Sequence, residues 1–123
     1  MMKKIQNFYE LEAWKKAHEL TLEIYKITKN FPREELFGIV NQLRRAVCST
    51  GANIAEGFER YHFNDKIRFY YQARGSVAEV QNFLLLAKDL GFINVDICKN
   101  LGEKANQVRQ LINGLIRSIE KQK

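Results

Sequence analysis

The chain has 123 residues, of which 46% are hydrophobic and 28% charged, and its 20 Lys and Arg against 14 Asp and Glu give a formal net charge of +6. This length predicts one domain, 1–123, with enough buried surface for a core. The composition excludes a disordered chain, and no apolar run approaches the roughly 20 residues of a membrane span. The basic balance permits binding to nucleic acid or to an acidic membrane but proves neither.

The two cysteines, Cys48 and Cys98, lie far apart, without a C-x-x-C motif and without a neighbouring histidine. We expect both to be small buried side chains in a reducing compartment, and neither a disulfide nor a zinc site. The first nine residues are mixed in character and carry only Lys3 and Lys4 as positive charge. We therefore expect no signal peptide, a cytoplasmic location and no membrane partner.

Apolar residues recur with helical period in four segments that three short breaks separate. The first segment runs from about Leu11 to Lys29. The second runs from about Pro32 to Arg60, because proline fits the first turn of a helix. The apolar face expected for the second segment consists of Leu36, Val40, Leu43, Val47, Ile54 and Phe58.

The third segment reaches about Leu90, with Asn64 or Asp65 as its expected N-terminal cap and Gly91 as its expected stop. The fourth segment starts near Asn94, another capping residue. Its apolar seam has nearly heptad spacing: Ile97, Leu101, Ala105, Val108, Ile112, Leu115 and Ile119. Because short breaks favour antiparallel neighbours, the sequence predicts an all-α, antiparallel up-down-up-down four-helix bundle.

The third segment carries more apolar residues than one helix face can hold. Phe83 is followed directly by three leucines, and Leu90 comes after them. Consecutive apolar residues cover every side of a helix, so one side is left for a second partner. Either this helix is wedged between two neighbours of its own bundle, or Phe83, Leu86 and Leu90 form a subunit interface.

The stretch "LRRAVCSTGANIAEGFER", residues 43–60, combines glycines, small polar residues and arginines, but it matches no known catalytic or phosphate-binding motif. It is no phosphate loop, because Phe58 and Glu59 stand where lysine and Ser/Thr are required. A nucleophile elbow, the arginine–histidine spacing of some four-helix RNases and the Glu-x-x-His pairs of di-iron bundles are also missing. We therefore predict no catalytic residue, metal ligand or cofactor, and a hydrolase is the least favoured function.

The same stretch fits one amphipathic helix whose polar stripe lies nearly opposite its apolar face: Arg45, Ser49, Asn53, Glu56 and Arg60. Glycine costs about 1 kcal/mol relative to alanine inside a helix, so Gly51 and Gly57 predict a close approach of another backbone. The segment of Gly75 and Ser76, with Glu79 one turn on, is the expected facing element. The stripe either bonds neighbouring helices or presents its arginines to phosphates, and the two can coexist.

The motifs "FPREELFGIVNQLRRA", "NIAEGFER", "ARGSVAEV" and "LAKDLGFI" resemble the four-helix-bundle family encoded in intervening sequences of bacterial 23S ribosomal RNA genes. That family is similar to the accessory variability protein of diversity-generating retroelements. The resemblance covers nearly the whole chain and implies a homopentamer without known catalytic activity. Its signature positions here are Arg44, Arg45, Ser49, Asn53, Glu56, Gly57, Arg60, Gly75, Ser76 and Glu79. Thr50 and Gly51 depart from the isoleucine and proline that the family more often has.

Together these features predict a non-enzymatic, oligomeric protein that binds nucleic acid, RNA more than DNA. The residues expected to contact phosphates are Arg44, Arg45, Arg60, Lys66, Arg68 and Arg74. Few aromatic residues are obvious stacking platforms, although Tyr61, Tyr70 and Tyr71 lie near these arginines in the sequence. The alternative is an oligomeric scaffold with no direct role in nucleic-acid binding, and the resemblance extends its partners to an enzyme such as a reverse transcriptase.

Overall fold

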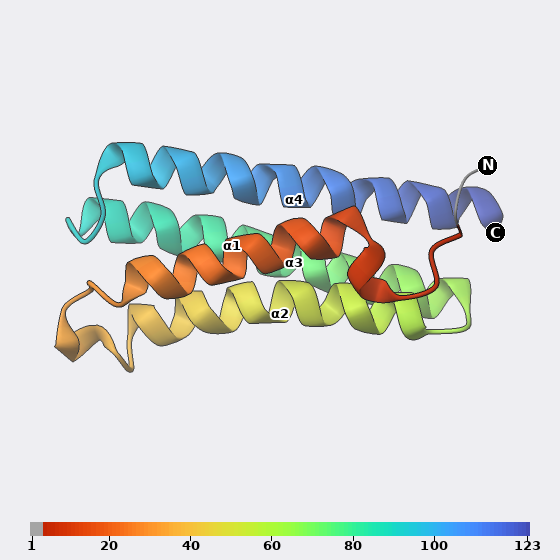
Figure 1. The fold of residues 1–123 in the computed structure, drawn as a ribbon, viewed down its shortest axis with the longest axis horizontal. Coiled ribbons are helices and arrows are strands. Elements are labelled where there is room, and N and C mark those ends of the chain that lie inside the picture. Colours follow the sequence, from red (N-terminus) through yellow and green to blue (C-terminus); the bar gives the residue numbers. More distant parts are fainter. Residues whose placement is uncertain (1–3) are drawn as a thin grey trace.

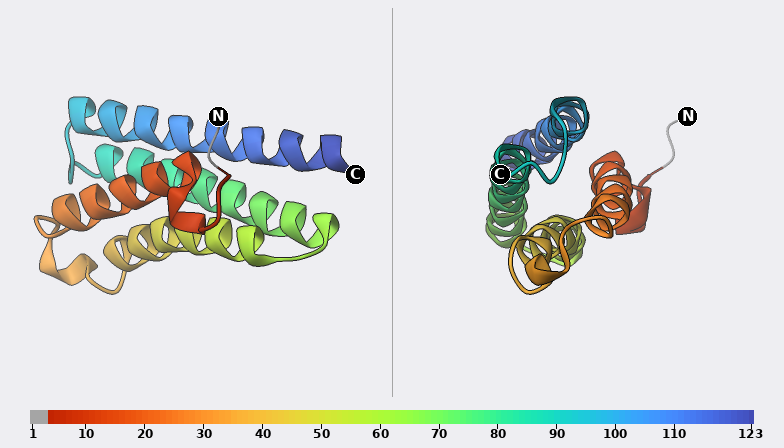
Figure 2. Two further views of the ribbon diagram at one scale, coloured as in Figure 1. Left: turned by 45° about the vertical axis from the view of Figure 1, so that its right-hand side comes forward. Right: turned by 90° about the vertical axis from the view of Figure 1, so that its left-hand side faces the viewer.

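The computed structural model describes residues 4–123 and places them in four long helices with two short 3-10 turns (Figure 1). Their bounds are η1 Phe8–Glu10, α1 Glu12–Thr28, η2 Arg33–Glu35, α2 Ile39–Glu59, α3 Phe63–Asp89 and α4 Val95–Gln122. Each helix packs beside the next one in the chain, and α4 also packs beside α1, so the four surround one core (Figure 2). The predicted antiparallel four-helix bundle is confirmed. Met1 to Lys3, which the predicted domain includes, lie outside the described residues.

The core is formed by one apolar stripe from each helix. Its largest fully buried side chains are Leu20, Ile24, Leu43, Val47, Ile54, Val77, Val80, Leu84, Val108 and Ile112. The predicted seam of α4 is buried at its centre, but towards the ends Cys98 replaces Ile97 and Ile116 replaces Leu115 among the buried residues. A straight α-helix rotates about 20° per heptad away from a strict seven-residue repeat, so a heptad seam drifts off the core.

The connection between α3 and α4 confirms Gly91 as the stop of α3 and Asn94 as the cap of α4. Gly91 has a φ of +81°. Its N–H donates to the carbonyl of Lys88 at 3.0 Å, while the N–H of Phe92 donates to that of Ala87 at 2.9 Å. This pair of bonds is the usual glycine-terminated end of a helix. Asn94 then caps α4, because its side chain accepts a hydrogen bond of 2.8 Å from the N–H of Ile97.

The predicted starts of α2 and α3 are wrong. Residues after Pro32 form only the 3-10 turn, and Leu36 is 49% exposed rather than part of the buried face. Gly38 has a non-helical backbone, which delays α2, and the carboxylate of Glu35 lies where a Cβ on Gly38 would sit. At α3, neither Asn64 nor Asp65 is the cap, since both lie inside the helix.

No helix among residues 4–123 combines the length and the apolar composition that a membrane crossing requires.

Candidate nucleic-acid interface

The hairpin formed by α2 and α3 carries most of the predicted phosphate-binding residues. Arg60 directly follows α2, Tyr61 and His62 complete a three-residue connection, and α3 begins at Phe63. The hairpin lies at the end of the bundle where α4 also ends (Figure 1). Residues from the end of α2 and the start of α3 therefore meet at one end of the molecule.

Two arginines share one aromatic ring at this end. The guanidinium carbons of Arg60 and Arg68 lie 4.6 Å and 4.7 Å from the centre of the Phe69 ring. Arg60 also pairs with Glu56 at 3.2 Å, and Arg68 with Asp65 at 3.9 Å. The two arginine side chains are 44% and 56% exposed. Exposed ion pairs of this kind contribute less than about 1 kcal/mol, so they orient the guanidinium groups without sealing them from a stronger anion.

Lys66 closes the end of α2 rather than extending into solvent. Its Nζ donates hydrogen bonds to the carbonyl oxygens of Phe58 at 2.6 Å and Gly57 at 3.4 Å. Helix ends leave their last carbonyls without partners, and a lysine satisfies them well. Desolvation by burial lowers the pKa of Lys66, and the negative charge of Glu59 opposes that shift. The ammonium group is thus committed to holding the hairpin together.

Arg74 links α3 to α4. It donates a hydrogen bond of 2.9 Å to the Oδ1 of Asn113, and its guanidinium carbon lies 4.8 Å from the centre of the Tyr71 ring. Tyr71 is 45% exposed. Tyr70, by contrast, is only 2% exposed, so its ring is not available to a ligand. Burial raises the pKa of Tyr70 to about 12.

Arg44 and Arg45 are neighbours in α2 but point to different surroundings. Arg44 is half-buried, donates to the Oγ1 of Thr28 at 3.0 Å and lies over the Tyr25 ring at 4.7 Å. Arg45 is exposed and makes no hydrogen bond or ion pair with the residues that the structure describes. It lines a shallow hollow between α2 and α3 together with Glu79. Of the six predicted phosphate contacts, the exposed ones are therefore Arg45, Arg60 and Arg68.

The middle of the polar stripe bonds α2 to α3. The hydroxyl oxygens of Ser49 and Ser76 lie 2.9 Å apart, and the amide of Asn53 donates to both the backbone carbonyl and the hydroxyl of Ser49. Two of the exposed arginines, Arg45 and Arg60, lie at the two ends of the same stripe. The two alternatives left open by the sequence thus coexist in geometry: helix-to-helix bonds in the middle and accessible cations at the ends.

The glycines of α2 and α3 differ in how closely they are packed. A Cβ on Gly57 would lie 2.6 Å from a ring atom of Tyr70, so this position does require glycine. A Cβ on Gly51 would have only an ordinary contact, 3.7 Å from Nε1 of Trp14, and one on Gly75 would meet nothing within 4 Å. The expected backbone approach is therefore wrong. The close contact is with a side chain, and Ser76 rather than Gly75 faces the stripe.

The two cysteines have different environments. Cys98 is buried as predicted, but Cys48 is exposed, which the sequence did not predict. The hydroxyl of Tyr25 lies 3.4 Å from the Sγ of Cys48. This hydrogen bond is the largest cause of a raised pKa of Tyr25, and desolvation by burial is the next largest. Within residues 4–123, no three His, Cys, Asp or Glu side chains form a cluster that could hold a metal ion.

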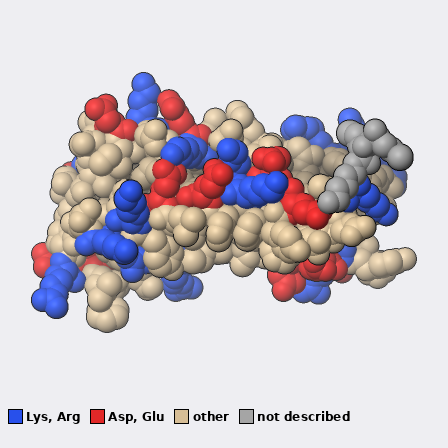
Figure 3. Space-filling model, in the orientation of Figure 1, with Lys and Arg blue, Asp and Glu red and all other residues tan. Residues whose placement is uncertain are grey.

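Positive charge is partly balanced by acidic side chains on the surface. On the face drawn in Figure 3, basic and acidic side chains are interspersed. Ion pairs elsewhere in the bundle include those of Glu12 with Lys15 and of Glu23 with Lys104. The last turns of α4 add two more basic residues, Arg117 and Lys121, to the hairpin end of the bundle. The sequence prediction did not include them among the phosphate contacts. It also missed Phe69, which only the pairing of α2 with α3 places between two arginines.

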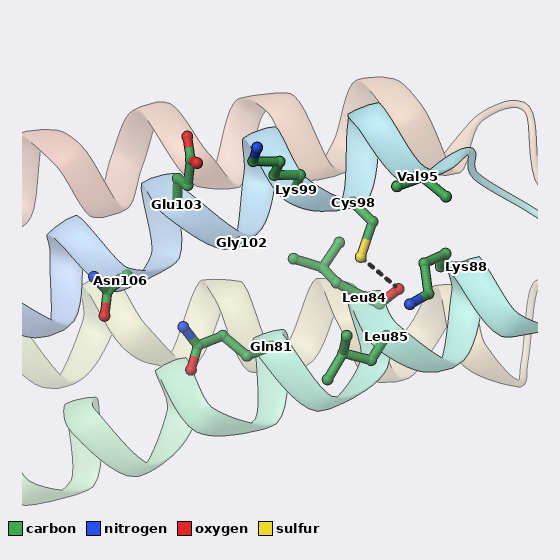
Figure 4. Close-up of a pocket in the computed structure, with 10 residues that line it drawn as sticks. All are labelled: Gln81, Leu84, Leu85, Lys88, Val95, Cys98, Lys99, Gly102, Glu103 and Asn106. Atoms are coloured by element: carbon green, nitrogen blue, oxygen red, sulfur yellow. Dashed lines mark hydrogen bonds between the residues drawn. The ribbon is translucent and has the colours of Figure 1, made fainter.

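The opposite end of α3 has an apolar groove against α4 (Figure 4). The groove has a volume of about 610 Å³ and is lined by Gln81, Leu84, Leu85, Lys88, Val95, Cys98, Lys99, Gly102, Glu103 and Asn106. Leu85 is 53% and Val95 67% exposed. Of the three predicted interface residues, Phe83 packs against the core, whereas Leu86 and Leu90 are 42% and 52% exposed. The apolar surplus therefore serves the bundle in part and leaves Leu85, Leu86 and Leu90 exposed.

Comparison with known proteins identifies the family and relates the fold to solved structures. The family model described as 23S rRNA-intervening sequence protein matches residues 9–114. A crystal structure of a protein of unknown function from the S23 ribosomal protein family of Bacteroides thetaiotaomicron is 22% identical, with a TM-score of 0.79. The match covers 85% of this chain and 95% of that one. At this identity the structure supports the fold alone. A comparison with curated proteins finds no match.

Proposed function

The chain belongs to the 23S rRNA-intervening sequence protein family, and from that premise we propose that it is a non-enzymatic RNA-binding protein. The observation that supports this proposal best is the pair of exposed guanidinium groups, from Arg60 and Arg68, on the ring of Phe69. Arginine presents a planar fork of donors that matches the oxygens of a phosphate, and stacking on an aromatic ring pre-orients that fork. The hairpin end is the proposed site of phosphate contact.

Arg45 is the proposed second contact along the same face of the hairpin. It lies 15 positions before Arg60 in α2, which corresponds to about 22 Å of helix. The remaining predicted residues, Arg44, Lys66 and Arg74, bond to other parts of the protein. They add positive charge to the field around the site while they hold the helices in place.

We also propose that copies of the chain assemble into a homopentamer. A single site built on two or three arginines gives weak binding at physiological salt. Several copies in one assembly make later contacts intramolecular, which raises the overall affinity without any new contact. Similarity to the retroelement accessory protein, and with it a reverse transcriptase as partner, belongs to this proposal too.

The proposal is tested by titrating a structured RNA with the protein at 50 and 200 mM salt, followed by fluorescence anisotropy. We expect affinity to fall steeply with salt, and the Arg60→Gln, Arg68→Gln double variant to flatten the slope of log K against log salt by about one unit per arginine. Arg33→Gln is the matched control, because Arg33 is exposed near the opposite end. Absence of binding at low salt, or binding that ignores salt, would contradict the proposal.

The second candidate function is an oligomeric scaffold without direct nucleic-acid contact. The exposed Leu86 and Leu90 favour it, because a second copy of this chain can cover these apolar side chains. We expect sedimentation above the chain mass of 14.4 kDa, and a smaller species for a Leu86→Glu, Leu90→Glu variant. A clean monomer for the unaltered protein would remove both the pentamer and this interface.

A further inference from the structure

We infer that the connection between α2 and α3 binds unpaired nucleotides, with a base stacked on the ring of Tyr61 and the flanking phosphates held by Arg60 and Arg68. This inference rests on the proposed RNA binding and specifies the kind of RNA. It concerns a side chain that neither the core nor the helix packing uses.

Tyr61 is 88% exposed, although it lies in a short connection between two long helices. Its ring contacts that of His62 edge to face, with ring centres 5.1 Å apart. The two rings are not stacked on each other, and with 88% of Tyr61 exposed at least one flat face of its ring is open to a ligand. An exposed aromatic ring is costly to hydrate, and base recognition uses such rings as stacking platforms.

The backbone on both sides of Tyr61 is held in place. The N–H of Arg60 donates to the carbonyl of Glu56 at 3.2 Å, and the carbonyl of His62 accepts from the N–H of Lys66 at 3.0 Å. The Lys66 ammonium also joins the start of α3 to the end of α2. Little order therefore needs to be gained in the connection when a ligand binds, which favours affinity.

Cations that suit the phosphates come from the same end of the hairpin. Arg60 directly precedes Tyr61 in the chain, and Arg68 shares the Phe69 ring with Arg60. An aromatic platform next to a basic groove is the usual arrangement for single-stranded RNA. In a duplex the bases already stack on one another and leave only their edges and phosphates accessible. A duplex can therefore reach the arginines but offers no base face to Tyr61.

The test compares two RNA probes of equal length at one low salt concentration, a 12-nucleotide uridine strand and a blunt 12-base-pair duplex. We expect Tyr61→Ala to weaken binding of the single strand by at least about fivefold and to change duplex binding less than twofold. Tyr61→Phe keeps the ring and is expected to retain the affinity. Phe37→Ala is the matched control, because Phe37 is 90% exposed in the connection near the other end of the bundle.

The outcomes separate this inference from the proposed function. Failure of the unaltered protein to bind either probe would overturn both. Binding of both probes with no effect of Tyr61→Ala, or with an equal loss for both, would overturn the inference alone and leave the phosphate contacts standing. A smaller sedimenting species for Tyr61→Ala would also overturn it, because the ring would then be a contact between copies.

Discussion

The arginines of α2 and α3 have similar sequence surroundings but different roles in the structure. Arg44 is bonded to Thr28 across the α1–α2 contact, whereas the adjacent Arg45 is exposed and has no such partner among the described residues. Periodicity assigns both to α2, but it cannot say which partner a long side chain reaches, because that depends on how the neighbouring helix is placed. The basic candidate set could thus be predicted from the sequence, and its division into exposed and bonded members could not.

Tyr70 provides a prediction at the scale of one titrating group. Burial raises its pKa from the ordinary 10.0 to about 12 in the folded protein. Between these values the unfolded chain has lost the proton that the folded chain keeps, so the free energy of unfolding falls as pH rises. By pH 11 the expected loss relative to pH 9 is about 1.4 kcal/mol. Below pH 10 this contribution is fully present.

The measurement is urea unfolding at pH 9 and pH 11 for the unaltered protein and for Tyr70→Phe. The variant has no hydroxyl to titrate at this position. Between pH 9 and pH 11 its free energy of unfolding is therefore expected to fall by about 1.4 kcal/mol less than that of the unaltered protein. Tyr61→Phe is the control, since Tyr61 is 88% exposed. An equal loss in the Tyr70→Phe variant and the unaltered protein would show that burial of Tyr70 does not hold its proton.

Among the elements, α2 and α3 depend most on one close contact. A Cβ on Gly57 would lie within 2.8 Å of two ring atoms of Tyr70 and 3.2 Å from Cβ of Phe69. Tyr70 is buried and cannot move aside freely. Gly75 occupies a comparable position in the interior of α3, but a Cβ there would meet nothing within 4 Å. The two glycines therefore form a matched pair for testing the packing.

We expect Gly57→Ala to destabilise the protein by about 1–2 kcal/mol, because overpacking exceeds the gain in helix propensity. Gly75→Ala raises the helix propensity of α3 without a steric clash, so it is expected to stabilise the protein by about 0.5–1 kcal/mol. Urea unfolding of both variants at pH 7 measures the difference. A stabilising effect of Gly57→Ala would mean that α2 and α3 are farther apart than described here.

The number, order and direction of the helices followed from the sequence, and so did two of their ends. Gly91 and Asn94 act through their own backbone or side chain, so local reasoning was sufficient. The predicted start of α2 was wrong because it relied on Pro32. The helix begins later, after the non-helical backbone of Gly38 and the neighbouring carboxylate of Glu35. The sequence was sufficient to predict that Gly57 is closely packed. It could not identify Tyr70 as the side chain packed against it, because only the pairing of α2 with α3 brings the two residues together.

At the scale of the whole molecule, the two proposed surfaces lie at opposite ends. The arginines of the hairpin lie where α4 ends, whereas Leu86 and Leu90 lie at the end of α3, near where α4 begins (Figure 1). Contacts between copies at the apolar end therefore leave the basic end accessible. An assembly and an RNA site are compatible in one protein, and neither surface needs to be rearranged for the other to work.

The most direct test of RNA binding at the hairpin is hydrogen–deuterium exchange of the full chain with and without an RNA hairpin that has an unpaired loop. The first amides of a helix lack partners within it, so those at the start of α3 exchange readily in the free protein. We predict slower exchange with RNA in residues 59–66 and no change in residues 29–38, the connection near the other end. Bound RNA that slowed exchange only in residues 29–38, or left residues 59–66 unchanged, would contradict the proposed site.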